Sequence, residues 1–268
     1  LGYRVLYLQV GFERRRFAAH EDLLCSRSQF FKERFQKGRK DIEGECVICH
    51  ENLSDLETDL TFCSDCGKNI HNKCIRKWKQ NQNTCPMCRT TWSNKKITKH
   101  EVFREIESEL FEVYVQWLYQ QSIPKYMEAK DDGPEIHCYR LLEAHMLGET
   151  LQDTDFQQAI RQEIIEFCLA NPKCIDTDVI ELVFHDNIAE DHILRKLILE
   201  LYALLGDPDW LVNTEEVPHR FIVDLAQAYV RKSKILLSAG GDVRKVLAEA
   251  GYIEQDDASL EDGDGVVG

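Results

Sequence analysis

The chain has 268 residues, of which 43% are hydrophobic, and a formal net charge of −14. That length suffices for about two domains, and no apolar run approaches the roughly 20 residues that a membrane-spanning helix needs. Residues 1–40 contain ten Lys and Arg against four Asp and Glu, whereas residues 131–268 contain eleven against twenty-nine. General binding of nucleic acid requires a basic face that neutralises phosphates. We therefore expect the chain to bind neither nucleic acid nor a membrane.

The chain begins at Leu1 rather than at methionine, so we expect it to be a fragment of a longer protein. No signal peptide is visible. Four of the eleven cysteines lie in apolar, helix-like contexts that are typical of core thiols, namely Cys25, Cys138, Cys168 and Cys174. This usage is typical of a reducing cytoplasmic or nuclear compartment rather than of a secreted disulfide scaffold.

The first 40 residues predict two strands followed by a helical region. Residues 3–10 alternate and are rich in Val, Leu and Tyr, which predicts a strand, and a second short strand is predicted over 16–19 after a turn. A helix begins after His20 and continues over residues 26–37, where three phenylalanines form one apolar face. Polar linkers then flank a cysteine-rich stretch, one over residues 37–44 and one over 93–96.

Beyond the second linker the patterns are mainly helical. Residues 97–103 are compatible with a strand, and Ser108 is a good N-cap for a helix that ends before Pro124. A DDGP loop then precedes six further helical patterns, which cover residues 137–147, 154–168, 178–184, 191–205, 217–232 and 242–250. From residue 254 the chain is acidic and Gly-rich, and we expect it to be disordered.

The most informative stretch, residues 46–89, holds four pairs of potential metal ligands. Three pairs are C-x2-C and one is H-x2-C, and together they are Cys46/Cys49, Cys63/Cys66, His71/Cys74 and Cys85/Cys88. Each Zn²⁺ takes four sulfur or nitrogen ligands, and a two-residue spacer lets both members of a pair reach one metal. Eight ligands in four pairs therefore suit two tetrahedral zinc sites.

The order of the pairs predicts how the two sites are shared. In a cross-braced module the first and third pairs bind one metal, and the second and fourth bind the other. The first site would then consist of Cys46, Cys49, His71 and Cys74, and the second of Cys63, Cys66, Cys85 and Cys88. Because the protein fills both sites, no position remains for a reactive water, and the zinc would be structural. Metal binding would supply most of the local folding free energy, on the order of 10 kcal/mol per site.

These residues resemble a RING finger of the ubiquitin-ligase type. Beyond the ligand spacing, CVIC carries Ile48 just before the second ligand, and CIRKWKQNQNTCPMCR places Trp78, Pro86 and Arg89 at the offsets found in RING fingers. The resemblance implies that Ile48, Trp78 and Pro86 form a shallow apolar groove for an E2 ubiquitin-conjugating enzyme. It also implies that Arg89 contacts both the E2 and its thioester-linked ubiquitin.

The ligand order departs from that of most RING fingers. Most have histidine at the fourth ligand position or at both the fourth and the fifth, whereas here Cys66 is fourth and His71 is fifth. The same C4HC3 order occurs in PHD fingers, which read histone tails. The short last interval and the closing CPMCR favour the RING.

The flanking residues resemble a BTB/POZ domain of the kind common in fungal proteins. VGFERRRFAAHEDLLCSRSQFF and ELFEVYVQWLYQQSIP carry this resemblance. The resulting fold class is a helix-rich α+β protein in which a BTB/POZ-like domain contains an inserted RING finger. The predicted divisions are a split BTB/POZ domain over 1–40 and 96–170, the RING finger over 41–92, a C-terminal helical extension over 171–253 and an acidic tail over 254–268. The resemblance implies homodimerisation and, in some members, binding to cullin-3.

The leading hypothesis is a RING-type E3 ubiquitin-protein ligase displayed on a BTB dimerisation domain, with an E2, ubiquitin and a protein substrate as partners. No nucleophile–base pair is evident, so such a RING would act by positioning and electrostatics rather than by covalent chemistry. The alternative from another class is a non-catalytic BTB interaction adaptor with a zinc-stabilised insert. A PHD-like histone reader is a weaker third hypothesis.

Overall fold

The computed structural model describes residues 4–53, 59–93, 101–124, 133–206, 217–238 and 243–252. Contacts divide the chain into two compact units. The first is Leu1–Met127 with Glu143–Ile160, and the second is Glu128–Leu142 with Arg161–Gly268. Within the described ranges, no helix combines the length and the hydropathy that a membrane span requires. The acidic tail predicted from residue 254 lies outside these ranges.

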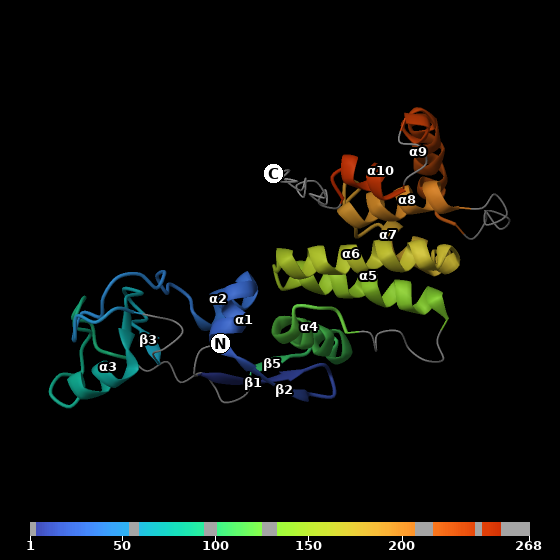
Figure 1. The fold of residues 1–268 in the computed structure, drawn as a ribbon. Helices are drawn as coiled ribbons and strands as arrows, with labels where there is room; N and C mark the ends of the chain where they lie inside the picture. Colours follow the sequence, from blue (N-terminus) through green and yellow to red (C-terminus); the bar gives the residue numbers. More distant parts are fainter. Residues whose placement is uncertain are drawn as a thin grey trace, which may run out of the picture. The chain divides into compact units, whose positions relative to one another are not determined.

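The first unit contains a three-stranded sheet in the order β2-β1-β5 (Figure 1). β1 (Val5–Val10) pairs antiparallel with β2 (Arg15–His20) and parallel with β5 (Glu101–Phe103). The turn between β1 and β2 begins at Gly11, whose φ of 82° is one that residues with a side chain rarely adopt. The two predicted strands and the turn between them are thereby confirmed.

Alternation along β1 gives the sheet one buried and one exposed face. Leu6, Leu8 and Val10 are buried, whereas Val5 and Tyr7 are 39% and 60% exposed. Successive side chains of a strand point to opposite faces, so the hydrophobic pattern fixes which face covers the core.

The predicted continuous helix over residues 26–37 is wrong, because Ser28 divides it. α1 (Glu21–Arg27) ends there, and α2 (Gln29–Phe35) begins at the next residue. Ser28 has an extended backbone, and its hydroxyl oxygen accepts a hydrogen bond from the Phe31 N–H at 3.2 Å. A serine in this position satisfies a helix N–H that would otherwise lack a partner. The same hydroxyl donates to the Leu151 carbonyl at 2.6 Å.

α4 (Ser108–Gln120) packs against β2 and supplies much of the core. Its buried side chains are Leu110, Phe111, Val113, Tyr114, Trp117 and Leu118, together with Ser108. The predicted N-cap is displaced by one residue: Glu107 occupies the N-cap position without a side-chain cap hydrogen bond, and Ser108 is the first residue of the helix. Phe111 contacts Phe31, and Tyr114 contacts Phe156 edge-to-face with 5.0 Å between ring centroids.

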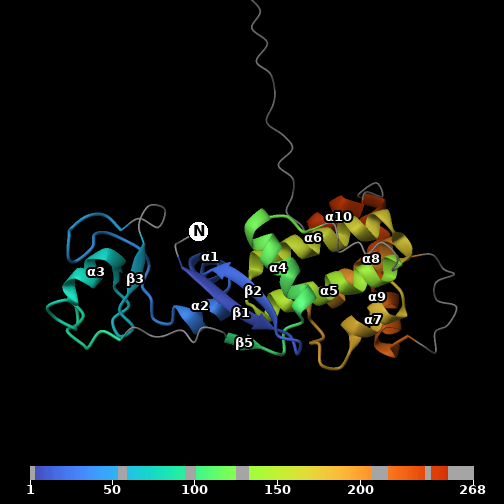
Figure 2. The same cartoon turned by 90° about the horizontal axis from the view of Figure 1, so that it is seen from below.

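The predicted RING segment, residues 41–92, lies in the chain between α2 and β5 (Figure 2). It contains β3 (Leu60–Phe62), which pairs antiparallel with β4 (Asn69–His71), and the following α3 (Asn72–Trp78). The chain leaves the host sheet after β2 and the two short helices, and it re-enters the same sheet at β5. In topology, the RING segment is therefore an insertion into the α/β host.

The second unit is helical. Two of its helices, α5 (Pro134–Thr150) and α6 (Thr154–Ala170), also contribute residues to the first unit. The remaining elements are the 3-10 helix η2 (Pro172–Cys174), α7 (Thr177–Phe184), α8 (Ile193–Leu205), α9 (His219–Ser238) and α10 (Val243–Glu249). Buried Arg195 donates to the carbonyls of Val183 and His185, at 2.8 and 2.7 Å. A cation at the C-terminal end of α7 satisfies carbonyls that have no partner within the helix.

The prediction of a mixed, helix-rich α+β chain with a cysteine/histidine cluster is thus confirmed. The assignment of the host to the BTB/POZ family stays a prediction. So do the domain boundaries drawn from the sequence.

Candidate metal centres

Each of the three C-x2-C pairs forms the same backbone turn. The residue after the second cysteine has a positive φ, which is 60° at His50, 72° at Gly67 and 63° at Arg89. Its N–H donates to the carbonyl of the first cysteine of the pair, at distances of 2.9, 2.8 and 3.0 Å respectively. This turn holds each pair of thiols in a compact arrangement suited to binding one metal ion.

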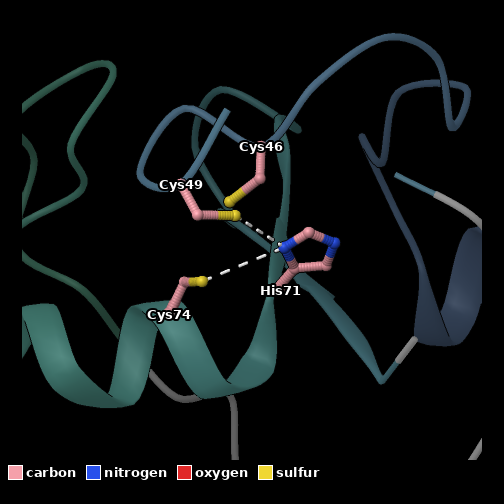
Figure 3. A group of neighbouring side chains, drawn as sticks. All are labelled: Cys46, Cys49, His71 and Cys74. Carbon is pink, nitrogen blue, oxygen red and sulfur yellow. Dashed lines mark hydrogen bonds between the residues drawn. The ribbon is translucent and has the colours of Figure 1, made fainter. Parts of the chain in front are cut away.

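The first ligand group gathers Cys46, Cys49, His71 and Cys74 (Figure 3). Their donor atoms all lie within 4.8 Å of one another, although they come from the first cysteine turn, the end of β4 and α3. The Nδ1 atom of His71 is 3.3 Å from the Cys49 sulfur and 3.9 Å from the Cys74 sulfur. The first and third pairs are therefore brought together.

The contact made by the Nε2 atom of His71 determines which ring nitrogen can bind metal. Nε2 lies 3.2 Å from the backbone carbonyl of Asn52. A carbonyl only accepts hydrogen bonds, so Nε2 carries the proton and Nδ1 keeps its lone pair toward the three thiols. This arrangement is the one that a histidine ligand requires, and burial of His71 to 1% exposure holds the ring in place.

The second ligand group consists of Cys63, Cys66, Cys85 and Cys88. The sulfur of Cys63 is 3.7 Å from that of Cys88, and the sulfur of Cys66 is 3.8 Å from that of Cys85. Four sulfurs around one Zn²⁺ at about 2.3 Å lie about 3.8 Å apart, so the spacing fits a tetrahedral site. The second and fourth pairs are therefore brought together as well.

The surroundings of Cys88 favour its thiolate. The Thr90 hydroxyl lies 2.9 Å from the Cys88 sulfur, and this contact, together with a hydrogen bond from the Thr90 backbone, is the main cause that lowers the pKa of the thiol to about 6. Zinc binds cysteine as the thiolate, so a donor that stabilises the anion also assists binding of the metal.

A small apolar core supports the ligand groups. It contains Leu53, Ile70, Ile75 and Trp92, packed with the four buried cysteines. Because this core is small, most of the folding free energy of the segment must come from the metal.

Arg39 joins the RING segment to its host. Its guanidinium contacts the Asp22 carboxylate of α1 at 2.6 Å and donates to the Asn69 side chain of β4 at 2.8 Å. It also lies over the Phe62 ring, 5.5 Å from the centroid, and only 7% of its side chain is exposed. The sequence predicts a polar linker over residues 37–44, and it does not predict that Arg39 within it is buried. Its two partners are 17 and 30 residues away in sequence, so no local pattern signals the contact.

Gly67 makes a second junction with the entry linker. Its carbonyl accepts a hydrogen bond from the Lys40 N–H at 3.0 Å. A Cβ atom at position 67 would lie 2.0 Å from the backbone oxygen of Gly38, which is a severe overlap. Glycine is therefore required here both by the positive φ and by the close approach of the linker.

The four residues predicted to contact an E2 lie on or near this scaffold. Ile48 and Trp78 pack against the RING core yet remain partly exposed, as does Pro86, and Arg89 is exposed. The Trp78 indole N–H donates to the Thr84 carbonyl at 2.9 Å, which fixes the orientation of the ring. Their contact with an E2 stays a prediction.

Comparison with known proteins identifies the segment. The family model described as Ring finger domain matches residues 44–89. The mouse "E3 ubiquitin-protein ligase DZIP3" is 42% identical over 59 residues, which are 20% of this chain and 5% of that protein. The human protein of the same name is 47% identical over 47 residues (18% and 4%), and the Arabidopsis "Probable E3 ubiquitin-protein ligase RHG1A" is 37% identical over 49 residues (18% and 7%).

The chain thus spans well under a tenth of the length of these three relatives, and the matches are short and lie in the RING region. The segment itself is a RING-type zinc finger, and it binds two zinc ions.

Substitution of Gly67 by alanine tests the junction with the linker. We expect the free energy of unfolding to fall by about 1–3 kcal/mol because the backbone is strained, and to fall further because the added carbon overlaps Gly38. The measurement is the rate of zinc release to a chelator, together with thermal unfolding. Gly44→Ala is the matched control, because its φ is 71° but nothing lies within 4 Å of the added carbon. Equal zinc release from the two variants would contradict the proposed steric role.

Substitution of Arg39 by methionine tests the bridge to α1. The change leaves the Asp22 and Asn69 groups without this donor, so we expect a loss of about 1–3 kcal/mol in the free energy of unfolding. Equilibrium urea denaturation measures it. Arg34→Met removes an ion pair with Glu101 whose arginine is 51% exposed. This control should cost less than about 1 kcal/mol, and a larger effect at Arg34 than at Arg39 would refute the assignment.

Proposed function

We propose that the chain acts as a RING-type E3 ubiquitin ligase, which recruits an E2~ubiquitin conjugate and promotes ubiquitin transfer to lysines of a protein substrate. One observation carries the proposal: two interlaced groups of four ligands lie within residues that match the Ring finger domain model. The names of the relatives cited above support it, since each is described as an E3 ubiquitin-protein ligase. Because the chain covers little of those proteins, the proposal rests on the RING segment alone.

The zinc ions have a structural role in this proposal. Cys46, Cys49, His71 and Cys74 bind one ion, and Cys63, Cys66, Cys85 and Cys88 bind the other. All four positions of each ion are then filled by protein, so neither ion activates a water. The zinc ions instead hold the surface on which the E2 docks.

Ile48, Trp78 and Pro86 form the docking surface for the E2 in this proposal. Support comes from their partial exposure and from the RING core beneath Ile48 and Trp78. Surfaces that are fixed before binding lose less conformational entropy when the partner arrives. The Trp78–Thr84 hydrogen bond contributes to that rigidity.

Arg89 contacts both the E2 and its bound ubiquitin. It follows the last zinc ligand directly, and its φ of 63° fixes the direction in which the side chain leaves the backbone. In the reaction, a substrate amine attacks the thioester carbonyl, an amide forms, and the E2 cysteine leaves as the thiol. The RING makes no covalent bond; it holds the conjugate in a reactive orientation and stabilises developing charge.

The host domain mediates self-association in this proposal, as the BTB/POZ resemblance implies. The supporting observation is a set of three exposed apolar side chains on one face of the sheet, where Val5 and Tyr7 of β1 lie on the same side as Val102 of β5. Cullin-3 remains an expectation from the resemblance alone. We assign the protein to the cytoplasm or nucleus, and the support is that none of the eleven cysteines is in a disulfide.

Discharge of ubiquitin from a loaded E2 tests the ligase. Ile48→Ala should lower the discharge rate at least tenfold while leaving the zinc content unchanged, because the side chain contributes apolar contact rather than ligation. Ile42→Ala is the matched control, since Ile42 also packs against the RING core but is not at an E2-contact position.

Arg89→Asn should also lower the discharge rate at least tenfold and leave the zinc content unchanged. Asparagine is chosen because it tolerates the positive φ at this position. His50→Asn makes an equivalent change in the first cysteine turn and should preserve activity.

If no member of an E2 panel supports discharge by the unmodified chain, the ligase proposal fails. NMR titration with each E2 then decides whether the module is an adaptor. Shifts at Ile48 and Trp78 without discharge would indicate binding alone, and the absence of shifts would exclude E2 recruitment.

Substitution of Tyr7 by glutamate tests self-association. A charge on the exposed face of β1 should weaken the dimer at least tenfold, as measured by sedimentation. Phe12→Glu is the control, because Phe12 is 86% exposed in the adjacent turn but lies outside the strand face. A wild-type chain that sediments as a monomer would refute the proposal for dimerisation.

A further inference from the structure

Three cysteines outside the RING converge in the second unit. Cys138 lies in α5, Cys168 in the last turn of α6 and Cys174 in η2. All three have 0% exposure, and their sulfur atoms lie within 4.8 Å of one another. The sequence predicted core thiols at these positions, which is confirmed, but it did not predict that they meet.

The spacing of these sulfurs resembles that of the RING ligand groups. The Cys138–Cys168 distance is 3.9 Å and the Cys168–Cys174 distance is 3.4 Å, against 3.7 and 3.8 Å in the all-cysteine RING site. Three sulfurs in a plane around one metal at about 2.3 Å lie about 4.0 Å apart. A small change in the sulfur–sulfur distances would therefore let the three sulfurs bind a single ion.

The ligand count distinguishes this group from the zinc sites. Among the described residues, no fourth histidine, cysteine or carboxylate joins the three sulfurs. A zinc ion with three protein ligands keeps a water in its fourth position, and such a site needs access to solvent. These sulfurs have none. Soft thiolates without a further ligand favour Cu(I) among the biological cations.

The charge around the triad also favours a cation. Glu135 precedes Cys138 by three residues on α5 and adds a negative charge near the triad. A thiolate in a fully buried position is costly unless a positive charge accompanies it.

We propose that Cys138, Cys168 and Cys174 form a third metal site, which binds one Cu(I) ion in three-coordinate thiolate geometry. Binding displaces the thiol protons to solvent and changes no oxidation state. The ion joins α5, α6 and η2, so it stabilises the helical unit by binding to the folded state. This site lies outside the RING residues and does not depend on the proposed ligase activity.

Element-specific X-ray absorption on the full, zinc-loaded chain tests the proposal. Cu(I) is supplied anaerobically from a chelator, and metals per chain are counted after gel filtration. We expect two zinc ions and one copper ion, with three sulfur neighbours around copper and an unchanged zinc spectrum. Copper that enters only as zinc leaves, or that has a nitrogen neighbour, would place it in the RING and overturn the proposal.

Variants locate the ion. Cys174→Ala and Cys138→Ser should each weaken copper retention at least tenfold, whereas Cys25→Ala should not. Cys25 is the matched control, because it is also a buried thiol but its sulfur donates to the Phe31 carbonyl and belongs to no cluster of the described residues. If both triad variants unfold, the wild-type absorption spectrum still decides. A Cys168–Cys174 disulfide found by mass spectrometry in protein purified under reducing conditions would overturn the proposal.

Discussion

The interlaced order of the zinc ligands is the constraint on which the RING segment depends. The first cysteine turn meets His71 and Cys74, and the chain between them contains the second turn, which belongs to the other group. The β3–β4 hairpin connects the two groups, so closure of one group brings ligands of the other closer together. This coupling makes one cooperative unit from a segment whose apolar core is too small to fold alone. It also explains why the partly exposed Ile48 and Trp78 can be held in fixed positions.

The contacts at Arg39 and Gly67 extend this rigidity into the host. Arg39 bonds to α1 on one side and to β4 on the other, and Gly67 packs directly on the backbone of the entry linker. A RING attached by a polar linker alone would sample many directions. Here one end of the linker is part of the packed structure, so the host influences the direction in which the module faces.

Much of this arrangement could be predicted from the sequence, because it is encoded in short-range patterns. The spacing of the ligand pairs predicted both groups, and alternation in β1 and the spacing of apolar residues in α4 predicted the host elements. What could not be predicted depends on distant residues. The division of α1 from α2 depends on Ser28, whose hydroxyl also bonds to Leu151, and the burial of Arg39 depends on Asp22 and Asn69. The convergence of Cys138 with Cys168 and Cys174 likewise requires the packing of three helical segments, which no spacing rule supplies.

The parallel pairing of β1 with β5 has a consequence for synthesis of the protein. The ribosome delivers β1 first, and the strand that completes its other edge follows only after the whole RING segment. Until then one edge of β1 remains unpaired, and exposed edges of this kind promote aggregation. A RING that has bound its zinc ions brings its two ends to defined places and shortens the search of β5 for β1, since closing a compact loop costs less entropy than closing an extended one. The supply of zinc during translation would thus control the maturation of a domain that contains none of its ligands.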